Sequence, residues 1–189
     1  MNRKSELFTR APEFRSLVPG RNRAIPRAMH PWVFVSGSLT RHLKSFCGPN
    51  FRVQVLRQSF ASPFPDERRL LQMRQGRWAL VREVALFSGN GPLVLARSVL
   101  PLKTLRGAGR RLAHLGNRPL GEFLFSYRNL DRVRFEVAEV DRSCWHPSVG
   151  SEYGLNGGTW GRRSLYTLAG RPLLVAEFFL PPLFSFPDP

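Results

Sequence analysis

Two charged side chains stand within stretches that otherwise have the composition of buried β-strands. Glu177 lies in GRPLLVAEFFLP and Arg82 lies in WALVREVALF, each among aliphatic and aromatic residues. A carboxylate in an apolar interior must be paired, hydrogen-bonded, protonated or facing a cavity, because its burial without a partner is very unfavourable. Neighbouring residues of a strand point to opposite faces, so one of Arg82 and Glu83 is expected to point inward.

These residue types suit the recognition of a small acid. A guanidinium presents a planar fork of donors that binds a carboxylate through two parallel hydrogen bonds. Arg82 is therefore either the structural partner of Glu177 or the clamp for a ligand carboxylate, and the pattern leaves both open. Strand alternation places Glu177 on the face of Val175 and Phe179. An edge strand with this face in water is the alternative interpretation.

The sequence contains little support for any other catalytic or metal-binding site. The two cysteines are far apart and form no CxxC pair, and the histidines are scattered, so we expect no metal site and no disulfide. No glycine-rich run follows a phosphate-loop pattern, and no Ser or Cys has an evident base partner. The positions concerned are Cys47, Cys144, His30, His42, His114 and His146.

Composition indicates one soluble domain with an anionic partner. The chain has 189 residues, of which 42% are hydrophobic, enough for one sizeable core. Lys and Arg number 29 against 13 Asp and Glu, which gives a formal net charge of +16. Polynucleotides, acidic membrane surfaces and small polyanionic substrates are all compatible with this charge. No apolar run reaches the ~18 residues of a membrane-spanning helix. A monomer in the reducing cytoplasm is expected.

Residues 1–29 are basic and lack sustained apolar periodicity. We therefore predict a mostly flexible N-terminal arm ahead of a folded domain at 30–189. An organelle transit peptide is a weaker interpretation, because this segment has few serines and several prolines.

Alternating and continuous apolar runs predict strands in the folded part. Ser38 is expected to cap a short helix, and Pro119 suits the first turn of another. Asn90-Gly91 and Ala169-Gly170 predict turns between paired strands. Sequential hairpins with interposed helices indicate a single α+β domain built on an antiparallel sheet. The expected strands are 51–60, 78–87, 93–101, 132–140, 159–168 and 172–180, and the expected helices are 38–46, 102–115 and a segment from 119.

The same segments resemble a known family. WALVREVALF, LARSVLPLKTL, LGNRPLGEFLF and TWGRRSLYTLAGRPLLVAEFFLP, and more weakly SLTRHL, occur in the order and approximate spacing of the chorismate lyase family, from about Trp32 to Leu183. The resemblance implies an antiparallel sheet of about six strands flanked by helices. It also implies elimination of pyruvate from chorismate without metal or organic cofactor, giving 4-hydroxybenzoate for ubiquinone synthesis.

The resemblance further implies roles for individual residues. The clamp for the ring carboxylate falls on Arg82, and the group facing the 4-hydroxyl end falls on Glu177. Backbone N–H donors to the same carboxylate fall on Leu39, where the family more usually has Met, and on Leu120. Chorismate and 4-hydroxybenzoate are thus the expected ligands of one closed pocket.

Two further features allow more than one interpretation. A second cation is expected to receive the enolpyruvyl carboxylate, and Arg162 or Arg163 of WGRRS is the candidate, although a solvated strand-face role suits either equally well. The loop at 141–158 is longer than is usual in the family. It either covers the mouth of the pocket or is a surface insertion, which we favour.

Two other functions compete with catalysis. A non-enzymatic module that binds an aromatic acid, as in the effector domains of one class of bacterial transcription regulators, would have the same fold. Residues 1–29 show no helix-turn-helix pattern to support it. Nucleic-acid binding is not expected, because the phenylalanines lie in apolar strand patterns rather than between Lys and Arg residues.

Overall fold

The computed structural model describes residues 5–16, 25–89 and 91–185. The strands are β1 (Arg15–Ser16), β2 (Arg52–Ala61), β3 (Ala79–Ser88), β4 (Gly91–Pro101), β5 (Leu130–Val140), β6 (Thr159–Leu168) and β7 (Arg171–Phe179). The α-helices are α1 (His30–Phe34), α2 (Leu39–Cys47), α3 (Pro65–Leu70), α4 (Leu102–Leu105), α5 (Leu120–Leu124) and α6 (Pro147–Glu152). The 3₁₀ helices are η2 (Arg27–Met29), η3 (Gly48–Asn50), η4 (Gly107–His114), η5 (Arg142–Cys144) and η6 (Pro181–Ser185).

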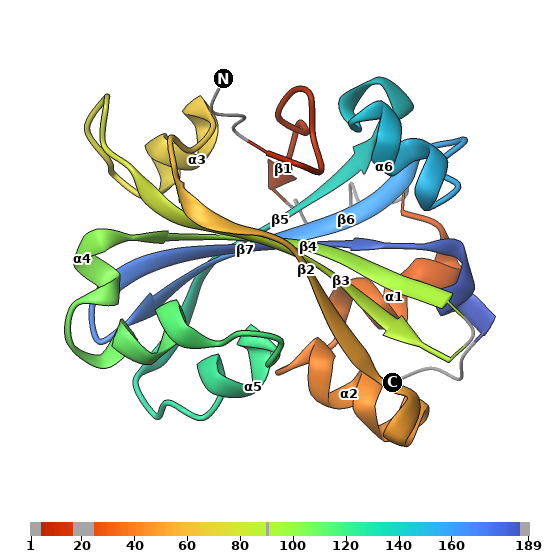
Figure 1. Ribbon diagram of the computed structural model, residues 1–189, viewed down its shortest axis with the longest axis horizontal. Helices are drawn as coiled ribbons and strands as arrows, with labels where there is room; N and C mark the ends of the chain where they lie inside the picture. The colour runs from red at the N-terminus through yellow and green to blue at the C-terminus, as the bar shows by residue number, and fades with distance from the viewer. Residues whose placement is uncertain (1–4, 17–24, 90, 186–189) are drawn as a thin grey trace.

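All described strands belong to one antiparallel sheet in the order β1-β5-β6-β7-β4-β3-β2 (Figure 1). The six long strands are those predicted from apolar patterning, and the α+β class is confirmed. The seventh strand, β1, has two residues, and it pairs with β5. In the turn between β6 and β7, Ala169 and Gly170 both have positive φ, 48° and 73°, which is the geometry that a tight hairpin requires. Of the other predicted turn, Asn90 lies outside the described residues.

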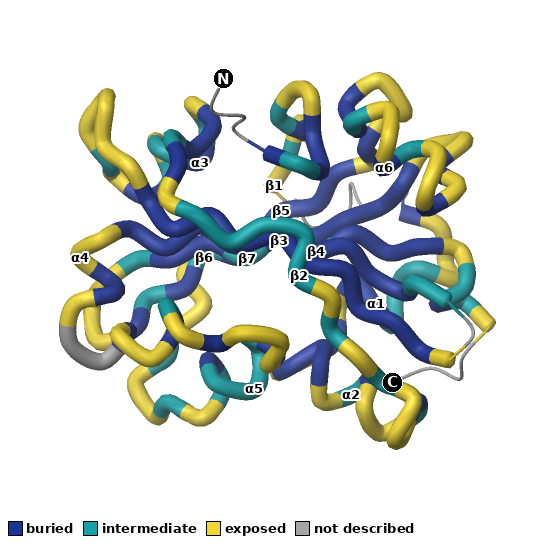
Figure 2. Tube along the Cα trace, viewed as in Figure 1, coloured by how far each residue is buried: buried dark blue, intermediate teal, exposed yellow. Residues whose placement is uncertain are grey.

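Helical segments cover both faces of this sheet (Figures 1 and 2). We call the face under α2, α4, η4 and α5 the cavity face, and the face under α3, α6 and residues 5–16 the arm face. Every residue of β3 is buried, as expected for a strand covered on both sides. Arg82 on the cavity face and Glu83 on the arm face are therefore both buried, 2% and 0% exposed. We expected one of the two to point inward; they lie on opposite faces as expected, and both are buried because helical segments cover both faces.

Residues 5–14 pack against the arm face and Arg15–Ser16 extend the sheet as β1, in contrast to the flexible arm expected for this segment. Leu7 and Phe8 are buried, and the Phe8 ring stacks on Trp145 with 4.6 Å between centroids. The backbone N–H of His146 donates to the carbonyl of Leu7. Periodicity could not reveal this contact, because the segment packs through two consecutive side chains and its backbone. Residues 1–4 and 17–24 of the predicted arm lie outside the described residues.

Buried charged residues of the arm face form a network of ion pairs and hydrogen bonds. The Glu83 carboxylate accepts hydrogen bonds from the Ser5 hydroxyl at 2.5 Å and from the Glu6 backbone N–H at 2.6 Å. Arg97 donates to Glu83 at 2.6 Å and to both oxygens of Glu67 at 2.7 and 2.9 Å. Burial lowers the pKa of Arg97, but the carboxylates of Glu67 and Glu83 outweigh it and raise this pKa above its ordinary value.

One prediction for the connecting segments needs correction. The helix expected over 102–115 is split into α4 and η4, and Gly109 lies so close to the Thr104 carbonyl that a Cβ atom would lie 2.0 Å from its oxygen. The loop at 141–158 contains η5 and α6 and packs on the arm face, so it does not cover the cavity described below. Within the ranges described, no helix combines the length and apolar content needed to cross a bilayer.

Candidate functional site

A cavity lies between the cavity face of the sheet and the N-terminal ends of α2 and α5. Its walls are mainly aliphatic, including Val84, Leu86 and Val175. Its charged side chains come from three strands: β3 supplies Arg82, β6 supplies Arg162, and β7 supplies Glu177. An apolar enclosure with a few convergent polar groups is the usual form of a small-molecule site.

Arg82 presents a buried positive charge to this cavity. One terminal nitrogen donates to the Gln58 side-chain oxygen at 2.5 Å, and the other donates to the Arg118 carbonyl at 3.1 Å. Both partners are neutral, and within the described residues no carboxylate pairs with Arg82. Burial accordingly lowers the pKa of the Arg82 guanidinium. A bound carboxylate would supply the missing countercharge.

Glu177 lies across the cavity and is paired with Arg162, not with Arg82. Arg162 Nε donates to Glu177 Oε2 at 2.6 Å, and the two residues are directly opposite in the register of β6 and β7. The side chain of Arg162 is 3% exposed, whereas that of Glu177 keeps 17% of its surface open. The strands that carry Arg82 and Glu177 are two positions apart in the sheet, about 10 Å between their backbones. The two groups thus face the cavity from separate sides.

The remaining contacts of Arg162 hold a neighbouring segment of backbone. Its Nη1 donates to the carbonyls of Trp32, Val33 and Val35, at 3.1–3.2 Å. These carbonyls come from α1 and from the segment that leads into α2. Arg162 therefore connects Glu177 to the backbone segment that leads into α2, one of the helices that cover the cavity.

Arg163, the other predicted second cation, points away from the cavity. It donates to Glu136 and to Asp66, with shortest distances of 2.6 and 2.5 Å, and these contacts lie on the arm face. Consecutive residues of β6 project to opposite faces, so the structure brings only Arg162 to Glu177. Arg163 is 5% exposed, which also excludes the solvated role.

Leu39 and Leu120 are the first residues of α2 and α5, and both line the cavity. The N–H groups of a first helical turn have no carbonyl of their own helix to bind, so they are available to an acidic ligand. Ser38 caps α2 as predicted, by accepting from the backbone N–H of Arg41. An ion pair of 2.6 Å between Lys44 and Glu122 joins the two helices on their outer side.

Gly121 sets how closely α5 approaches α2. A Cβ atom at this position would lie 3.0 Å from the hydroxyl oxygens of Ser38 and Thr40. Replacement by valine is expected to push the first turn of α5 outward and to displace the Leu120 N–H. An error of about 1 Å in a positioning group costs up to about a hundredfold in rate, and we expect kcat/KM to fall at least about tenfold. Gly150 of α6, where a Cβ meets nothing within 4 Å, is the matched control. Equal kinetics of Gly121→Val and Gly150→Val would contradict this role.

Further polar residues of the site escaped the sequence prediction. Tyr166 lies beside Arg162 and Glu177 in the cavity, and Ser98 lines it from β4. Burial, and secondarily the charge of Glu177, raise the pKa of Tyr166. Gln58, the partner of Arg82, belongs to β2. None of these side chains interrupts an apolar run as a charge does, so their positions could not be singled out from the sequence.

Comparison with known proteins supplies the family. The chorismate lyase family model matches residues 19–186. A probable chorismate pyruvate-lyase from Methylococcus capsulatus is 62% identical over 160 residues, which cover 85% of this chain and 99% of the relative. One from Azoarcus sp. is 41% identical over 172 residues, covering 88% of this chain and 90% of the relative.

Solved structures are similar in fold alone. The effector domain of PhnF from Mycobacterium smegmatis has a TM-score of 0.55 at 16% identity, covering 77% of this chain and 90% of that domain. The C-terminal domain of the histidine utilization repressor from Pseudomonas syringae pv. tomato has a TM-score of 0.56 at 10% identity, covering 70% and 92%. The family match extends over α2, α5 and all three charged residues of the cavity. The chain belongs to the chorismate lyase family.

Proposed function

We propose that this protein is a chorismate pyruvate-lyase that releases 4-hydroxybenzoate for ubiquinone biosynthesis. One observation carries the proposal: a buried guanidinium that has no carboxylate partner among the described residues faces an apolar cavity, and a carboxylate faces the same cavity from a strand two positions away. A ligand with an acid at one end and a hydroxyl at the other satisfies both groups. The names of the relatives agree with this ligand.

The reaction requires little covalent help from the protein. The bond between C3 of the ring and the ether oxygen breaks, and the hydrogen on C4 leaves as a proton. The electron pair of the C4–H bond completes the aromatic ring, and the enolpyruvate that departs becomes pyruvate when its methylene carbon takes up a proton. Aromatisation provides the driving force, so positioning of chorismate in a reactive conformation is the main task of the site.

Each end of the substrate has its own partners. Arg82 binds the ring carboxylate with its fork, and the backbone N–H groups of Leu39 and Leu120 donate to the same group. Glu177 accepts a hydrogen bond from the C4 hydroxyl and assists removal of the C4 proton. Oε2 of Glu177 is bound to Arg162, which leaves Oε1 to meet the substrate.

Both cysteines, Cys47 and Cys144, are buried free thiols, which supports a reducing compartment such as the cytoplasm.

Incubation with chorismate in the presence of a chelator tests the proposal. Equimolar pyruvate and 4-hydroxybenzoate are the expected products, measured by a coupled lactate dehydrogenase assay and by chromatography that separates hydroxybenzoate isomers. Binding of 4-hydroxybenzoate without turnover of chorismate would contradict catalysis and favour a ligand-sensing module. Formation of another isomer would contradict the assignment of Glu177 to the 4-hydroxyl end.

A further inference from the structure

Three large apolar side chains are exposed at one end of the sheet. Phe60, Trp78 and Leu102 are 44%, 48% and 46% exposed. Phe60 of β2 is opposite Leu80 of β3, so Phe60 and Trp78 project from the same face as diagonal neighbours. Leu102 follows Pro101, the partner of Ala79, and so lies beside Trp78. We call these three residues the apolar tip.

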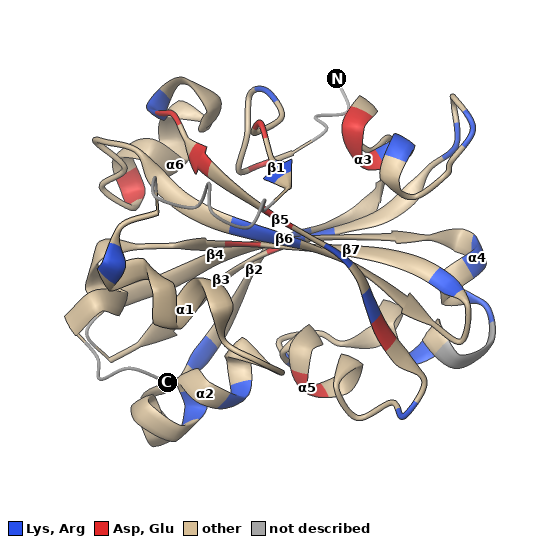
Figure 3. Ribbon diagram, turned by 180° about the vertical axis from the view of Figure 1, so that it is seen from behind, with Lys and Arg blue, Asp and Glu red and all other residues tan. Residues whose placement is uncertain are grey.

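Basic side chains surround the apolar tip. Between Arg68 and Gly121 the sequence has a single acidic residue, Glu83, and that residue is buried. Figure 3 shows only basic residues coloured on α4 and on the turn that leads into β3. Within the part of the chain that the structure describes, none of these basic side chains forms an ion pair with a carboxylate. The exposed residues concerned are Arg74, Arg77, Lys103, Arg106, Arg110 and Arg111.

We propose that this end of the molecule binds the surface of an anionic lipid membrane. Trp, Phe and Leu are the side chains that enter the boundary between headgroups and acyl chains, and Lys and Arg pair with anionic headgroups around them. The apolar tip and the basic residues near it thus provide insertion into the membrane boundary and attraction to anionic headgroups at the same end of the molecule. It also accounts for part of the net charge of +16, which one dianionic substrate in a closed cavity does not require.

A nucleic acid is the other polyanion to consider, and the tip fits it less well. Single-stranded nucleic acids bind where flat aromatic rings stack on the bases along a basic groove. Leu102 is one third of the tip and has no flat face for a base. An acyl boundary accepts all three side chains.

Trp78 provides a direct reporter of the contact. The protein has four tryptophans, and Trp32, Trp145 and Trp160 are buried, so a change in emission on contact with a surface arises from Trp78. The full chain is titrated with vesicles of phosphatidylcholine alone and with added phosphatidylglycerol. We expect a blue shift and co-sedimentation with the anionic vesicles only, both weakened by salt.

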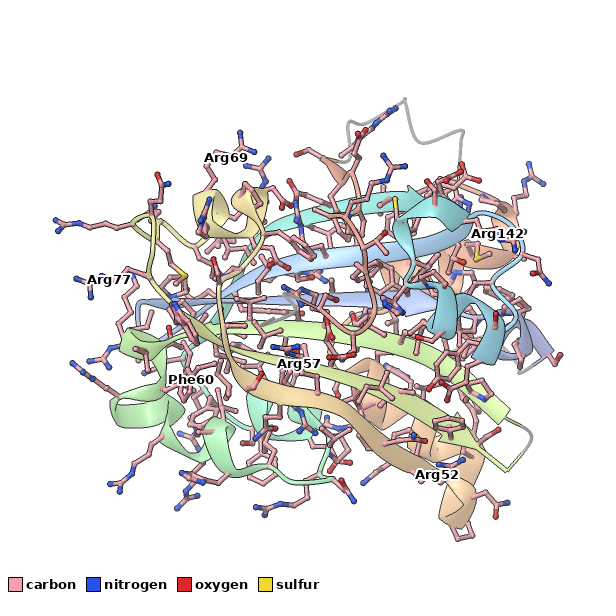
Figure 4. All side chains as sticks on the ribbon, turned by 45° about the horizontal axis from the view of Figure 1, so that its top comes forward. Arg52, Arg57, Phe60, Arg69, Arg77 and Arg142 are labelled. Carbon is pink, nitrogen blue, oxygen red and sulfur yellow. The ribbon has the colours of Figure 1, made fainter. Side chains whose placement is uncertain are left out.

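Paired variants separate the two contributions. Phe60→Ala with Leu102→Ala keeps the reporter and is expected to weaken binding to anionic vesicles at least about tenfold. Arg77→Glu with Arg106→Glu is expected to abolish it. Val133→Ala, at an exposed apolar residue of β5, and Arg142→Glu are the controls, and Figure 4 shows Arg142 at the opposite end of the molecule from Phe60 and Arg77. Release of 4-hydroxybenzoate and circular dichroism verify that each variant is folded.

Several outcomes would overturn the proposal. These are absence of binding to anionic vesicles, equal binding of the tip variants and their controls, or binding to neutral vesicles alone. A Trp78 response to single-stranded DNA without any response to vesicles would assign the surface to nucleic acid instead. Concentration-dependent dimerisation lost in the tip variants, again without vesicle binding, would assign it to a second copy of the chain.

Discussion

Replacement of Glu177 by glutamine is expected to lower kcat for pyruvate release by about a hundredfold or more, which is the usual contribution of a positioned acid–base group. Glutamine has nearly the same shape and can still accept a hydrogen bond from Arg162. It has no negative charge and cannot take up a proton. Affinity for 4-hydroxybenzoate should change much less than kcat, because Arg82, and not Glu177, binds the carboxylate of the ligand.

The measurement is steady-state release of pyruvate, with product affinity from fluorescence titration and folding from circular dichroism. Glu139→Gln, an exposed residue of β5, is the matched control and should leave the kinetics unchanged. Turnover by Glu177→Gln close to that of the wild type would exclude the proposed role. Chorismate deuterated at C4 adds a second measurement, since slower turnover of this substrate indicates that proton removal limits the rate.

Arg82→Lys is the second change with a large expected effect. Lysine keeps the charge but loses the planar fork and its bonds to Gln58 and to the Arg118 carbonyl. Loss of one hydrogen bond to a charged group costs about 1.5–3 kcal/mol, which corresponds to about a ten- to a hundredfold fall in kcat/KM. The loss should appear mainly in KM, and affinity for 4-hydroxybenzoate should fall in parallel.

Arg142→Lys at an exposed position controls for the change of side chain. Thermal unfolding measured in parallel separates loss of binding from loss of structure, because Arg82 is almost fully buried. Unchanged affinity for 4-hydroxybenzoate in a folded Arg82→Lys variant would contradict the carboxylate clamp.

Arg82 and Glu177 could be predicted from the sequence because a charge within an apolar run is conspicuous. Arg97 in LVLARSVLP carries the same signal, and the same reasoning applied to it would have predicted one more buried charge in need of a partner. What the sequence could not supply was the pairing. Glu177 bonds to Arg162 because the register of β6 against β7 places them opposite each other, and register depends on contacts that are distant along the chain.

The helices that cover the sheet were predicted less well than the strands. Each long strand is visible as an alternating or a continuous apolar run, whereas α4, α5 and α6 are each six residues or shorter, too short for a helical period to establish itself. The packing of Leu7 and Phe8 was not visible in the sequence for a similar reason, since two adjacent apolar residues establish no period. Their burial depends on partners such as Trp145, far along the chain.

The contact between the N-terminal segment and Glu83 means that the domain carries its own tethered ligand. Ser5, Glu6 and Leu7 donate to a carboxylate that is 0% exposed, in the way that a peptide binds an anionic receptor. A tether of this kind keeps the local concentration of the ligand very high, so binding persists without strong individual contacts. A peptide of residues 5–16 added to a chain that lacks them would have to bind from solution, and the stability of the domain would then depend on peptide concentration.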